Sequence, residues 1–573
     1  MIYDIRPSLK FLGVFLLTLI IYLPFSRLGV DPHHDGIMLT PALVVARGGV
    51  IHQDIFSQYG PITAYMQALF VWIFGPHLLS IRIASVIYLS LAVALLYSSW
   101  RRVFGEGIAL FAYLLLISSS YFFVSNSPMH PWSSDVMLFL QALTVYLLVV
   151  GHSSHGKNAY ILTYLGGFVL GLQFANRYVS AFLMLIGLSI YFYLLHKKRE
   201  LRTLWFGVLT STGAALLLLL LSGSYSEWYF QAIQFPRNWV SNVSGSSGWL
   251  AVRGALITQA LPGAALLLMA VFGFNAVSSC YRFLSSLQRL LIVLFVSLVL
   301  IVSSPKLTIP YWNTNAILWS FAGLLLISTP WYLLRFSNRD TNTATGEMIP
   351  FFAATAASAA IFPISDIRHL YWGLIPAIGP GLMFLKSHLH LKRNQIVLAL
   401  LSLALLVPST LQTVDETLNM DRVAVANVPI LKGMLMDRKY GQFFEHRFKV
   451  VDKFLAVHPT TPILNICSDG LFASLAPALK FPDPYFVSWQ FGWDFFNSNT
   501  SEGRNRLSFV RNARPMVWMC PLMEDPQLVA QKYELRLIPI DPNVDTHEPY
   551  NWWPYISYLG VPKEWPQIDL ELR

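Results

Sequence analysis

Long apolar runs dominate the first 411 residues of the sequence. Many of them extend over roughly 18–22 residues, which is enough for a helix to cross a membrane. Candidate spans lie near residues 9–25, 82–100, 107–125, 136–150, 159–175, 178–195, 203–222, 254–275, 289–303, 314–334, 348–363, 369–385 and 395–411. The sequence therefore predicts an all-α polytopic membrane bundle of about thirteen transmembrane helices, counted from these runs.

The pattern changes near residue 412. "FKVVDKFLAVH" predicts a helix, "TPILNIC" predicts a buried strand, and "FVRNARPMVWMC" predicts the end of a helix followed by another strand. Strands that alternate with helices indicate an α/β unit. We therefore expect residues 1–411 to form the membrane domain and residues 412–573 to form a small α/β domain outside the membrane.

The distribution of basic residues predicts the orientation of the chain. With the N-terminus in the cytoplasm, the predicted inside connections hold 16 Lys and Arg residues and the outside connections hold 8. Cytoplasmic loops of membrane proteins carry this excess. An odd number of spans then places the C-terminal domain outside. The first outside connection, residues 26–81, contains the apolar stretch "GPITAYMQALFVWIFG", which is short for a span and predicts a helix at the membrane interface.

Composition agrees with a membrane protein and excludes one class of partner. The chain is 55% hydrophobic and 12% charged, whereas soluble domains carry about 25% charged residues. Basic cytoplasmic loops account for the net charge of +10. No basic patch is interleaved with aromatic residues, so we expect no nucleic-acid partner.

Ionisable residues gather in the predicted outer connections. "DPHHDG" places Asp35 beside the first span, where a charged side chain is a functional candidate. The alternative is an N-cap, because "HDGIMLTPALVVA" looks like the start of a helix. The second outer loop, "SNSPMHPWSSDVM", brings His130 and Asp135 to the same face, where Asp135 or Ser133 is again a candidate cap.

Two further outer segments carry basic residues. "FANRYVS" holds Arg177, and "ISDIRHLYWGLIP" holds Arg368, His369 and Tyr371. The planar fork of Arg suits phosphate; the alternative for both arginines is an ion pair with a loop carboxylate. Carboxylates and arginines on one face suit a reaction between a lipid-linked phosphate and a polar acceptor, with a carboxylate as general base and arginines holding the leaving group.

The first outer connection resembles the signature of the GT-C membrane glycosyltransferases, especially the protein O-mannosyltransferase and aminoarabinose-transferase type, which is glycosyltransferase family 39-like. In that family an acidic pair opens this loop, followed by small residues, an acidic position and a "YGP" turn. The matching positions here are His34-Asp35-Gly36, Ala46, Gly48, Gly49, Asp54, Phe56, Tyr59-Gly60-Pro61, Tyr65, Phe74-Gly75 and Arg82. "GGFVLGLQFANRYV" and "IRHLYWGLIP" are similar to later family motifs.

The resemblance implies a GT-C fold, a polyprenyl-phosphate sugar donor and inverting transfer. It also implies that an acidic residue of the first outer loop acts as base, which by position is Asp35. The chain departs from the family by having His34 where many members have an acid, so Asp31 is a second candidate base. Residues expected to bind substrate are His34, Asp54, Tyr59, Arg82, His130, Asp135, Arg177, Arg368, His369 and Tyr371.

No cofactor is specified by the sequence. Some GT-C enzymes bind a divalent metal ion with acids of the outer loops, so a metal is left open. The C-terminal domain resembles the extracytoplasmic domain of many such enzymes, which implies acceptor binding or a lid.

The expected function is transfer of a sugar to a glycan, lipid or protein acceptor on the outer side of the membrane. A bacterial cytoplasmic membrane is the expected location, with membrane lipids around the bundle. The alternatives are a transporter or flippase of a lipid-linked saccharide, and a scaffold that keeps the fold without the chemistry.

Overall fold

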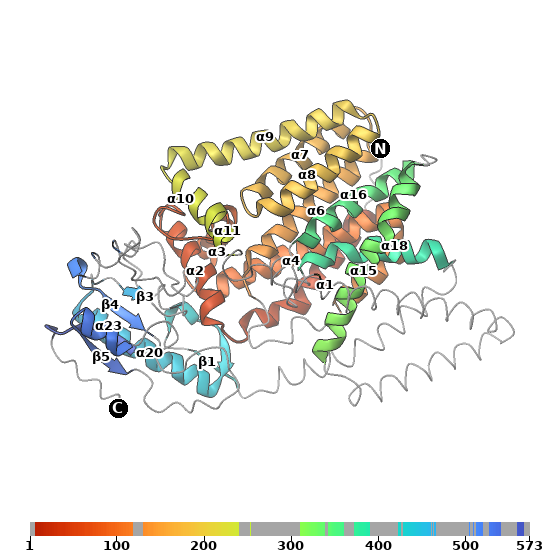
Figure 1. Cartoon of the computed structure of the whole chain (residues 1–573). Helices are drawn as coiled ribbons and strands as arrows, with labels where there is room; N and C mark the ends of the chain where they lie inside the picture. The colour runs from red at the N-terminus through yellow and green to blue at the C-terminus, as the bar shows by residue number, and fades with distance from the viewer. Residues whose placement is uncertain are drawn as a thin grey trace, which may run out of the picture.

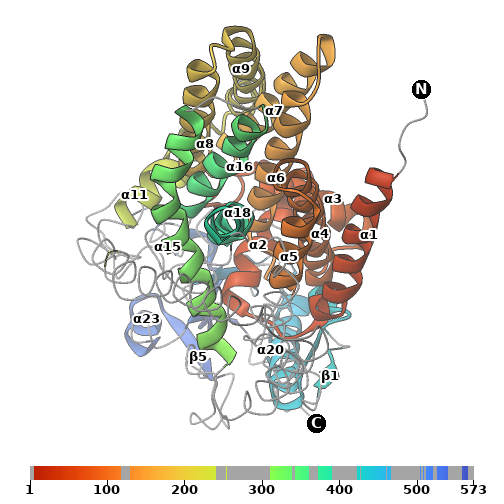
Figure 2. The same ribbon diagram turned by 90° about the vertical axis from the view of Figure 1, so that its right-hand side faces the viewer.

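The computed structural model describes residues 6–117, 130–239, 310–337, 342–359, 372–389, most of 422–465, 511–519, 526–539 and 558–565, with a few single residues. The helices of the membrane part form a bundle on one side (Figure 1), and the C-terminal strands and helices gather beside the first outer connection. Figure 2 shows the same arrangement turned by a quarter of a circle, with α1 on the outside of the bundle.

Ten helices of the described residues lie at predicted spans. They are α1 Arg6–Tyr22, α4 Leu78–Phe104, α5 Glu106–Ile117, α6 Ser133–His152, α7 Lys157–Phe174, α8 Tyr178–Leu194, α9 Lys198–Leu221, α15 Pro310–Ser337, α16 Asn342–Ser358 and α18 Ile378–Leu389. Among the described residues, four helical stretches are long and apolar enough to cross a membrane: residues 8–27, 78–104, 133–152 and 198–221. The predicted spans at 254–275, 289–303 and 395–411 lie outside the described residues.

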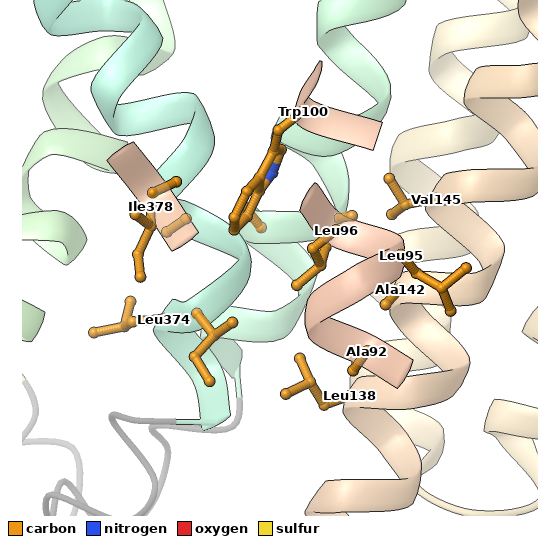
Figure 3. Close-up of a cluster of buried hydrophobic side chains, with 14 of the residues drawn as sticks. Ala92, Leu95, Leu96, Trp100, Leu138, Ala142, Val145, Leu374 and Ile378 are labelled. Carbon is orange, nitrogen blue, oxygen red and sulfur yellow. The ribbon is translucent and has the colours of Figure 1, made fainter. Parts of the chain in front are cut away.

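The core of the bundle is built around α4 and α6. Trp100, Leu95 and Leu96 on α4 are buried. Their side chains lie among those of Ala142 and Val145 on α6 and of Leu374 and Ile378 before and within α18 (Figure 3). This packing fixes the position of α4 relative to α6, and the candidate site lies at the ends of these two helices.

Small residues allow α7 and α9 to approach closely. A Cβ atom on Gly167 would lie 2.2 Å from the backbone oxygen of Leu204, and one on Gly207 would lie 2.2 Å from that of Tyr164. Close backbone contact at small residues is a common mode of helix packing in membranes. The other face of α9 leaves Leu218 and Leu221 exposed, as expected for a face that meets lipid.

The first outer connection contains a 3-10 turn, Leu23–Arg27, and two helices, α2 Pro32–Ala46 and α3 Ile62–Phe74. The stretch that is predicted to lie at the membrane interface forms the helix α3. Its Thr63 and Gln67 side chains are buried, whereas Trp72 and Ile73 are more than half exposed. An apolar face of this kind suits the interface between membrane and water.

The C-terminal part contains the predicted helix, α20 Arg438–Val457, and a four-stranded mixed sheet. Its strands run in the order β3 Ile463–Asn465, β4 Met516–Met519, β6 Tyr558–Pro562 and β5 Leu535–Pro539. β3 is parallel to β4, and the other pairs are antiparallel. A separate hairpin pairs β1 Arg422–Ala424 with β2 Leu435–Asp437, and α23 Pro526–Lys532 packs beside β5.

The C-terminal part shares a hydrophobic core with the first outer connection. Leu39 and Ile81 belong to the same buried cluster as Phe444, Phe448 and Trp518. The backbone N–H of Gly29 donates a 2.7 Å hydrogen bond to the carbonyl of Leu435. The end of the chain therefore holds the loop in which the candidate catalytic residues lie.

A short irregular segment follows α9 and returns to the same connection. It comprises α10 Tyr225–Tyr229, the π-helical turn Phe230–Gln234 and α11 Phe235–Trp239. The Gln231 amide oxygen accepts hydrogen bonds from the Nδ1 atom of His52 and the backbone N–H of Ser57, both 3.0 Å long. Its amide nitrogen donates to the His52 carbonyl. One side chain thus fixes the turn between α2 and α3.

Candidate active site

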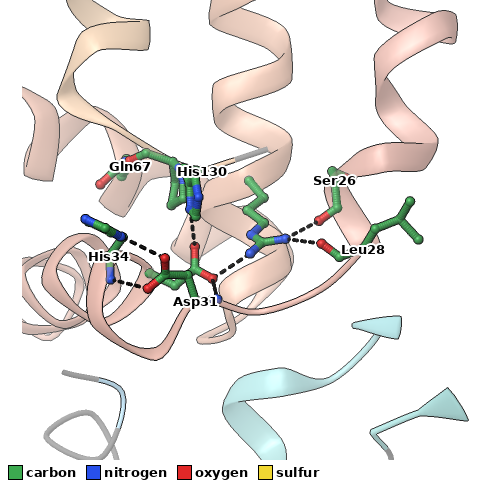
Figure 4. A network of polar contacts seen from close by, with 9 residues as sticks. Ser26, Leu28, Asp31, His34, Gln67 and His130 are labelled. Carbon is green, nitrogen blue, oxygen red and sulfur yellow. Dashed lines mark hydrogen bonds and ion pairs between the residues drawn. The ribbon is translucent and has the colours of Figure 1, made fainter. Parts of the chain in front are cut away.

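A buried ion pair joins the beginning of α2 to the beginning of α4. The Arg82 guanidinium donates from Nη2 to Asp35 Oδ2 at 2.5 Å, and both side chains are 0% exposed. Arg82 Nη1 also donates to the carbonyl oxygens of Leu28 and Ser26, at 2.9 and 3.4 Å. Figure 4 shows Ser26 and Leu28 on the chain that enters α2, and Asp31, His34 and His130 around the start of the helix.

The surroundings of Asp35 stabilise its ionised form. Burial raises the pKa of the Asp35 carboxyl, but the charge of Arg82 and the neighbouring His130 lower it more, so the pKa lies below its usual value. Oδ2 also accepts a hydrogen bond from the Asp31 backbone N–H at 2.8 Å, and Oδ1 lies 3.7 Å from His130 Nδ1. The predicted base is therefore a buried carboxylate whose Oδ2 atom is bound by protein donors, whereas its Oδ1 atom has no hydrogen-bond partner among the described residues.

Asp31 caps α2 and holds His34. Its Oδ1 atom accepts the backbone N–H of His34 at 3.0 Å, and its Oδ2 atom lies 2.7 Å from His34 Nδ1. Asp before a helix that begins with Pro is a favourable N-terminus. The expected cap of this helix is thus made by Asp31, whereas Asp35 lies within the first turn and pairs with Arg82.

Three rings meet beside this cap. The His34 ring lies 4.7 Å from that of Trp132 and 5.6 Å from that of His130, measured between centroids. The Trp132 indole N–H is buried and has no hydrogen-bond partner among the described residues. The second outer loop therefore meets the first at His34, and His130, which is predicted to bind substrate, lies beside it.

A second group of polar side chains surrounds Arg177. Its guanidinium lies over the Tyr59 ring, with Cζ 4.9 Å from the centroid, and its Nε atom donates to Ser133 Oγ at 3.1 Å. Asn176 accepts a 2.6 Å hydrogen bond from Thr63 and donates to the Ser133 carbonyl. Arg177, predicted either to bind phosphate or to form an ion pair, is thus held by a ring and a hydroxyl.

The "YGP" turn has a steric reason for its glycine. A Cβ atom on Gly60 would lie 1.9 Å from the backbone oxygen of Ala175, and the Gly60 N–H donates to the Asn176 carbonyl at 3.0 Å. The backbones of the first outer connection and of the turn between α7 and α8 are therefore in direct contact. This contact brings Tyr59 to Arg177.

The two other predicted carboxylates differ in their roles. Asp54 accepts the backbone N–H of Val50 at 2.8 Å and closes its own turn. Asp135 lies buried in the first turn of α6, and neither oxygen has a hydrogen-bond partner among the described residues. Trp132 occupies the N-cap position of α6 without a side-chain hydrogen bond, so the expected cap by Asp135 or Ser133 is not formed.

Three predicted site residues, Arg368, His369 and Tyr371, lie outside the described residues. Within the described part of the chain, no three His, Cys, Asp or Glu side chains gather closely enough to hold a metal ion. Asp35, the buried carboxylate of the first loop, is moreover occupied by Arg82. The donor set described here therefore does not fit a divalent metal ion.

Sequence reasoning missed Trp132 and Asn176 as members of the site. The only signal was position, because each directly adjoins a predicted turn at an outer helix end. The contact between Asp31 and His34 could have been predicted from their spacing. Asp31 precedes a Pro, which favours a helix start, and His34 three residues later lies on the same helical turn as this cap.

Residues 58–224 match a protein-family model described as dolichyl-phosphate-mannose-protein mannosyltransferase. The predicted resemblance to the GT-C glycosyltransferases is confirmed over this stretch. It contains Tyr59, Arg82, His130, Asp135 and Arg177, which are five of the predicted site residues. The comparison with curated protein sequences gave no match.

Solved structures match the chain at low sequence identity. ArnT from Cupriavidus metallidurans bound to undecaprenyl phosphate is 12% identical, with a TM-score of 0.45 over 97% of this chain and 98% of that one. The oligosaccharyltransferase of Archaeoglobus fulgidus in the apo form is 15% identical, with a TM-score of 0.48 over 91% of this chain and 70% of that one.

Proposed function

We propose that the protein is an inverting glycosyltransferase that moves a sugar from a polyprenyl-phosphate carrier to a glycan, lipid or protein acceptor. The observation that carries the proposal is the meeting of the first two outer loops, which brings Asp31, His34, Asp35 and His130 together at the ends of α4 and α6. The match of residues 58–224 to a mannosyltransferase family supports it.

The proposal assigns the phosphate of the donor to Arg177. This guanidinium is partly buried and rests on Tyr59, and Ser133 holds its Nε atom. The terminal nitrogens of such a fork are suited to phosphate oxygens and stabilise the charge that develops on a leaving phosphate. Arg82 is already bound by one carboxylate and two carbonyls, so its proposed task is to shape the loop. The prediction that Arg368, His369 and Tyr371 bind substrate is retained.

The proposal places the site on the outer side of a bacterial cytoplasmic membrane, with the N-terminus inside. Its support is the excess of Lys and Arg in the predicted inside connections. Residues 412–573 are proposed to form an extracytoplasmic domain that contributes to acceptor binding. Their described part packs on α2 and on the start of α4, beside the catalytic loop.

Transfer from purified protein tests the proposal directly. The protein in lipid nanodiscs is incubated with radiolabelled polyprenyl-phosphate sugars and a cell-envelope acceptor fraction, and label in the acceptor is counted. We expect transfer with one donor class, and we expect Arg177→Gln to lower it at least tenfold. Arg102→Gln also removes one arginine charge, from an exposed position at the C-terminal end of α4, away from the candidate site. It serves as the matched control.

The transporter alternative has a distinct result. Absence of transfer with every donor, together with movement of a lipid-linked sugar across the bilayer of sealed liposomes, would replace the proposal by a flippase. Absence of both activities in a folded protein would favour the scaffold.

A further inference from the structure

We propose that His34, oriented by Asp31, is the general base that takes the proton of the acceptor hydroxyl, and that Asp35 is a positioning residue. The inference rests on the proposed function and goes beyond it by naming the group that receives the proton. It differs from the assignment by resemblance, in which Asp35 is the base.

The hydrogen bond between the two side chains fixes the tautomer of His34. A carboxylate only accepts hydrogen bonds, so the 2.7 Å contact between Asp31 Oδ2 and His34 Nδ1 places the proton on Nδ1. The lone pair of the neutral ring then lies on Nε2, which is the atom that can take a proton. A carboxylate that orients an imidazole in this way also stabilises the imidazolium that forms.

Both oxygens of Asp31 act on the same residue. Oδ1 accepts the backbone N–H of His34, and Oδ2 binds its ring. The helix cap and the Asp31–His34 pair, here called the dyad, are therefore one structure. The first turn of α2 fixes the direction of the His34 ring. This pre-organisation is what a general base needs, because the proton transfer depends on geometry first.

The surroundings of Asp35 oppose a role in proton transfer. Its side chain is 0% exposed, whereas those of His34 and Asp31 are 25% and 16% exposed. Oδ2 already accepts from Arg82 and from the Asp31 backbone N–H. A carboxylate that is stabilised as an anion by such donors has a lowered affinity for a proton. Its hydrogen bond to the Asp31 N–H instead links the ion pair to the dyad.

The reaction balances with these groups. The acceptor hydroxyl gives its proton to His34 Nε2 while its oxygen forms a bond to the anomeric carbon of the sugar. The bond from that carbon to the phosphate oxygen breaks, and its electron pair leaves with the polyprenyl phosphate. The imidazolium, paired with Asp31, then returns its proton to solvent. A single nucleophilic displacement at the anomeric carbon inverts its configuration.

The rings beside His34 have chemistry that suits contact with a sugar. Trp132 lies against the imidazole, and its buried indole N–H has no partner among the described residues. An aromatic face with a hydrogen-bond donor at its edge suits a saccharide, which presents both C–H groups and hydroxyl oxygens. The titratable groups around His34 in the described part of the chain are Asp31 on its own helix, His130 before α6, and the Asp35–Arg82 pair.

The test compares kcat, KM and pH profile of four proteins that transfer label from the productive donor. The variants are His34→Gln, His34→Asp and Asp31→Asn, with the wild type beside them. Loss of a general base costs about 10²- to 10⁴-fold. We therefore expect His34→Gln to lower kcat at least 100-fold with little change in the KM for donor. Asp31→Asn should lower kcat as well, because Nδ1 loses its charged partner.

The His34→Asp variant separates a base from a structural residue. It restores the acidic pair typical of the resembled family, so it should keep more activity than His34→Gln. Its acid limb should move to lower pH, because a carboxylic acid titrates near 4 and an imidazole near 6.5 in model peptides. A residue that only packs would give Gln and Asp variants of similar activity and unshifted profile.

Controls distinguish the ways in which the inference can fail. His155→Gln changes an exposed histidine after α6, far from these residues in the chain, and should leave kcat unchanged. Thermal unfolding shows that each variant is folded. An active wild type with a fully active His34→Gln would overturn the dyad while the proposed function stands. A wild type without transfer from any donor would overturn the proposed function itself.

Discussion

Asp35 and Arg82 are 47 positions apart in the chain, yet the guanidinium donates directly to the carboxylate with both side chains fully buried. The pair joins the first turn of α2 to the N-terminal part of α4. Arg82 also donates to two carbonyls of the preceding loop. One side chain of α4 therefore contacts both this loop and α2.

Removing the arginine should destabilise the fold. Arg82→Gln leaves the Asp35 carboxylate buried without its counter-charge, and breaking such a pair costs about 3–5 kcal/mol. We expect a lower unfolding temperature in detergent, measured by intrinsic fluorescence. Arg102→Gln on the same helix is exposed and is the matched control. Equal unfolding temperatures for Arg82→Gln and wild type would contradict the importance assigned to the pair.

The close contact at Gly60 predicts a steric effect. Gly60→Ala would push a methyl group into the carbonyl of Ala175, so the turn between α7 and α8 must move away. We expect lower stability and weaker donor binding, because Arg177 moves with this turn. Gly213→Ala on α9 has nothing within 4 Å of the added carbon and should not destabilise. A stable, active Gly60→Ala protein would show that the contact is not needed.

The ring under Arg177 predicts a graded effect on donor binding. Tyr59→Phe keeps the aromatic face, whereas Tyr59→Leu removes it. A cation–π contact at a partly buried site contributes about 0.5–2 kcal/mol. We therefore expect the KM for donor to rise about twofold to thirtyfold in Tyr59→Leu, with little change in Tyr59→Phe. Equal KM values for the two variants would show that the ring does not orient the guanidinium.

Acid should destabilise the turn that holds His52. Burial lowers the pKa of His52 from 6.5 to about 4, although the hydrogen bond to Gln231 opposes this shift. Above pH 6.5 the ring is neutral in both folded and unfolded chains, so its full contribution to stability is present. Between pH 6.5 and 4 only the unfolded chain takes the proton, and stability falls by about 3 kcal/mol in total.

His52→Asn provides the measurement for this prediction. Asn tolerates the positive φ of 70° at this position and has an amide N–H for Gln231. Unfolding temperatures of wild type and variant are compared at pH 7.5 and pH 5. The wild type should lose more stability than the variant on acidification. Parallel loss in both proteins would place the acid sensitivity elsewhere.

The periodicity of the sequence predicted the elements well, because long apolar runs and helix breakers are local signals. The predicted spans at α4, α6 and α9 and the predicted helix at α20 are all observed. The predicted outer-loop residues His34, Asp35, Arg82 and His130 are brought together. Charge and loop position indicated His34, Asp35 and His130, and the family resemblance indicated Arg82.

The interaction partners of those residues could not be predicted from the sequence. Arg82, which is predicted to bind substrate, is paired with Asp35, because tertiary packing brings the start of α4 beside α2. Asp54, also predicted to bind substrate, accepts the backbone N–H of Val50 in a local turn. Carboxylates that cap, pair or catalyse look alike in a sequence, and only the donors around each one distinguish them.

The hydrogen bond from Gly29 to Leu435 sets an order on biosynthesis. The first outer loop is made early, but the strand that fixes it, with the core that covers α2, is translated more than 400 residues later. During translation the first outer loop therefore lacks this hydrogen bond and the shared core. The loop can adopt its final conformation only after the C-terminal part has been synthesised. A chain that stops before residue 412 should show fast hydrogen exchange at Gly29, whereas the full chain should protect this amide.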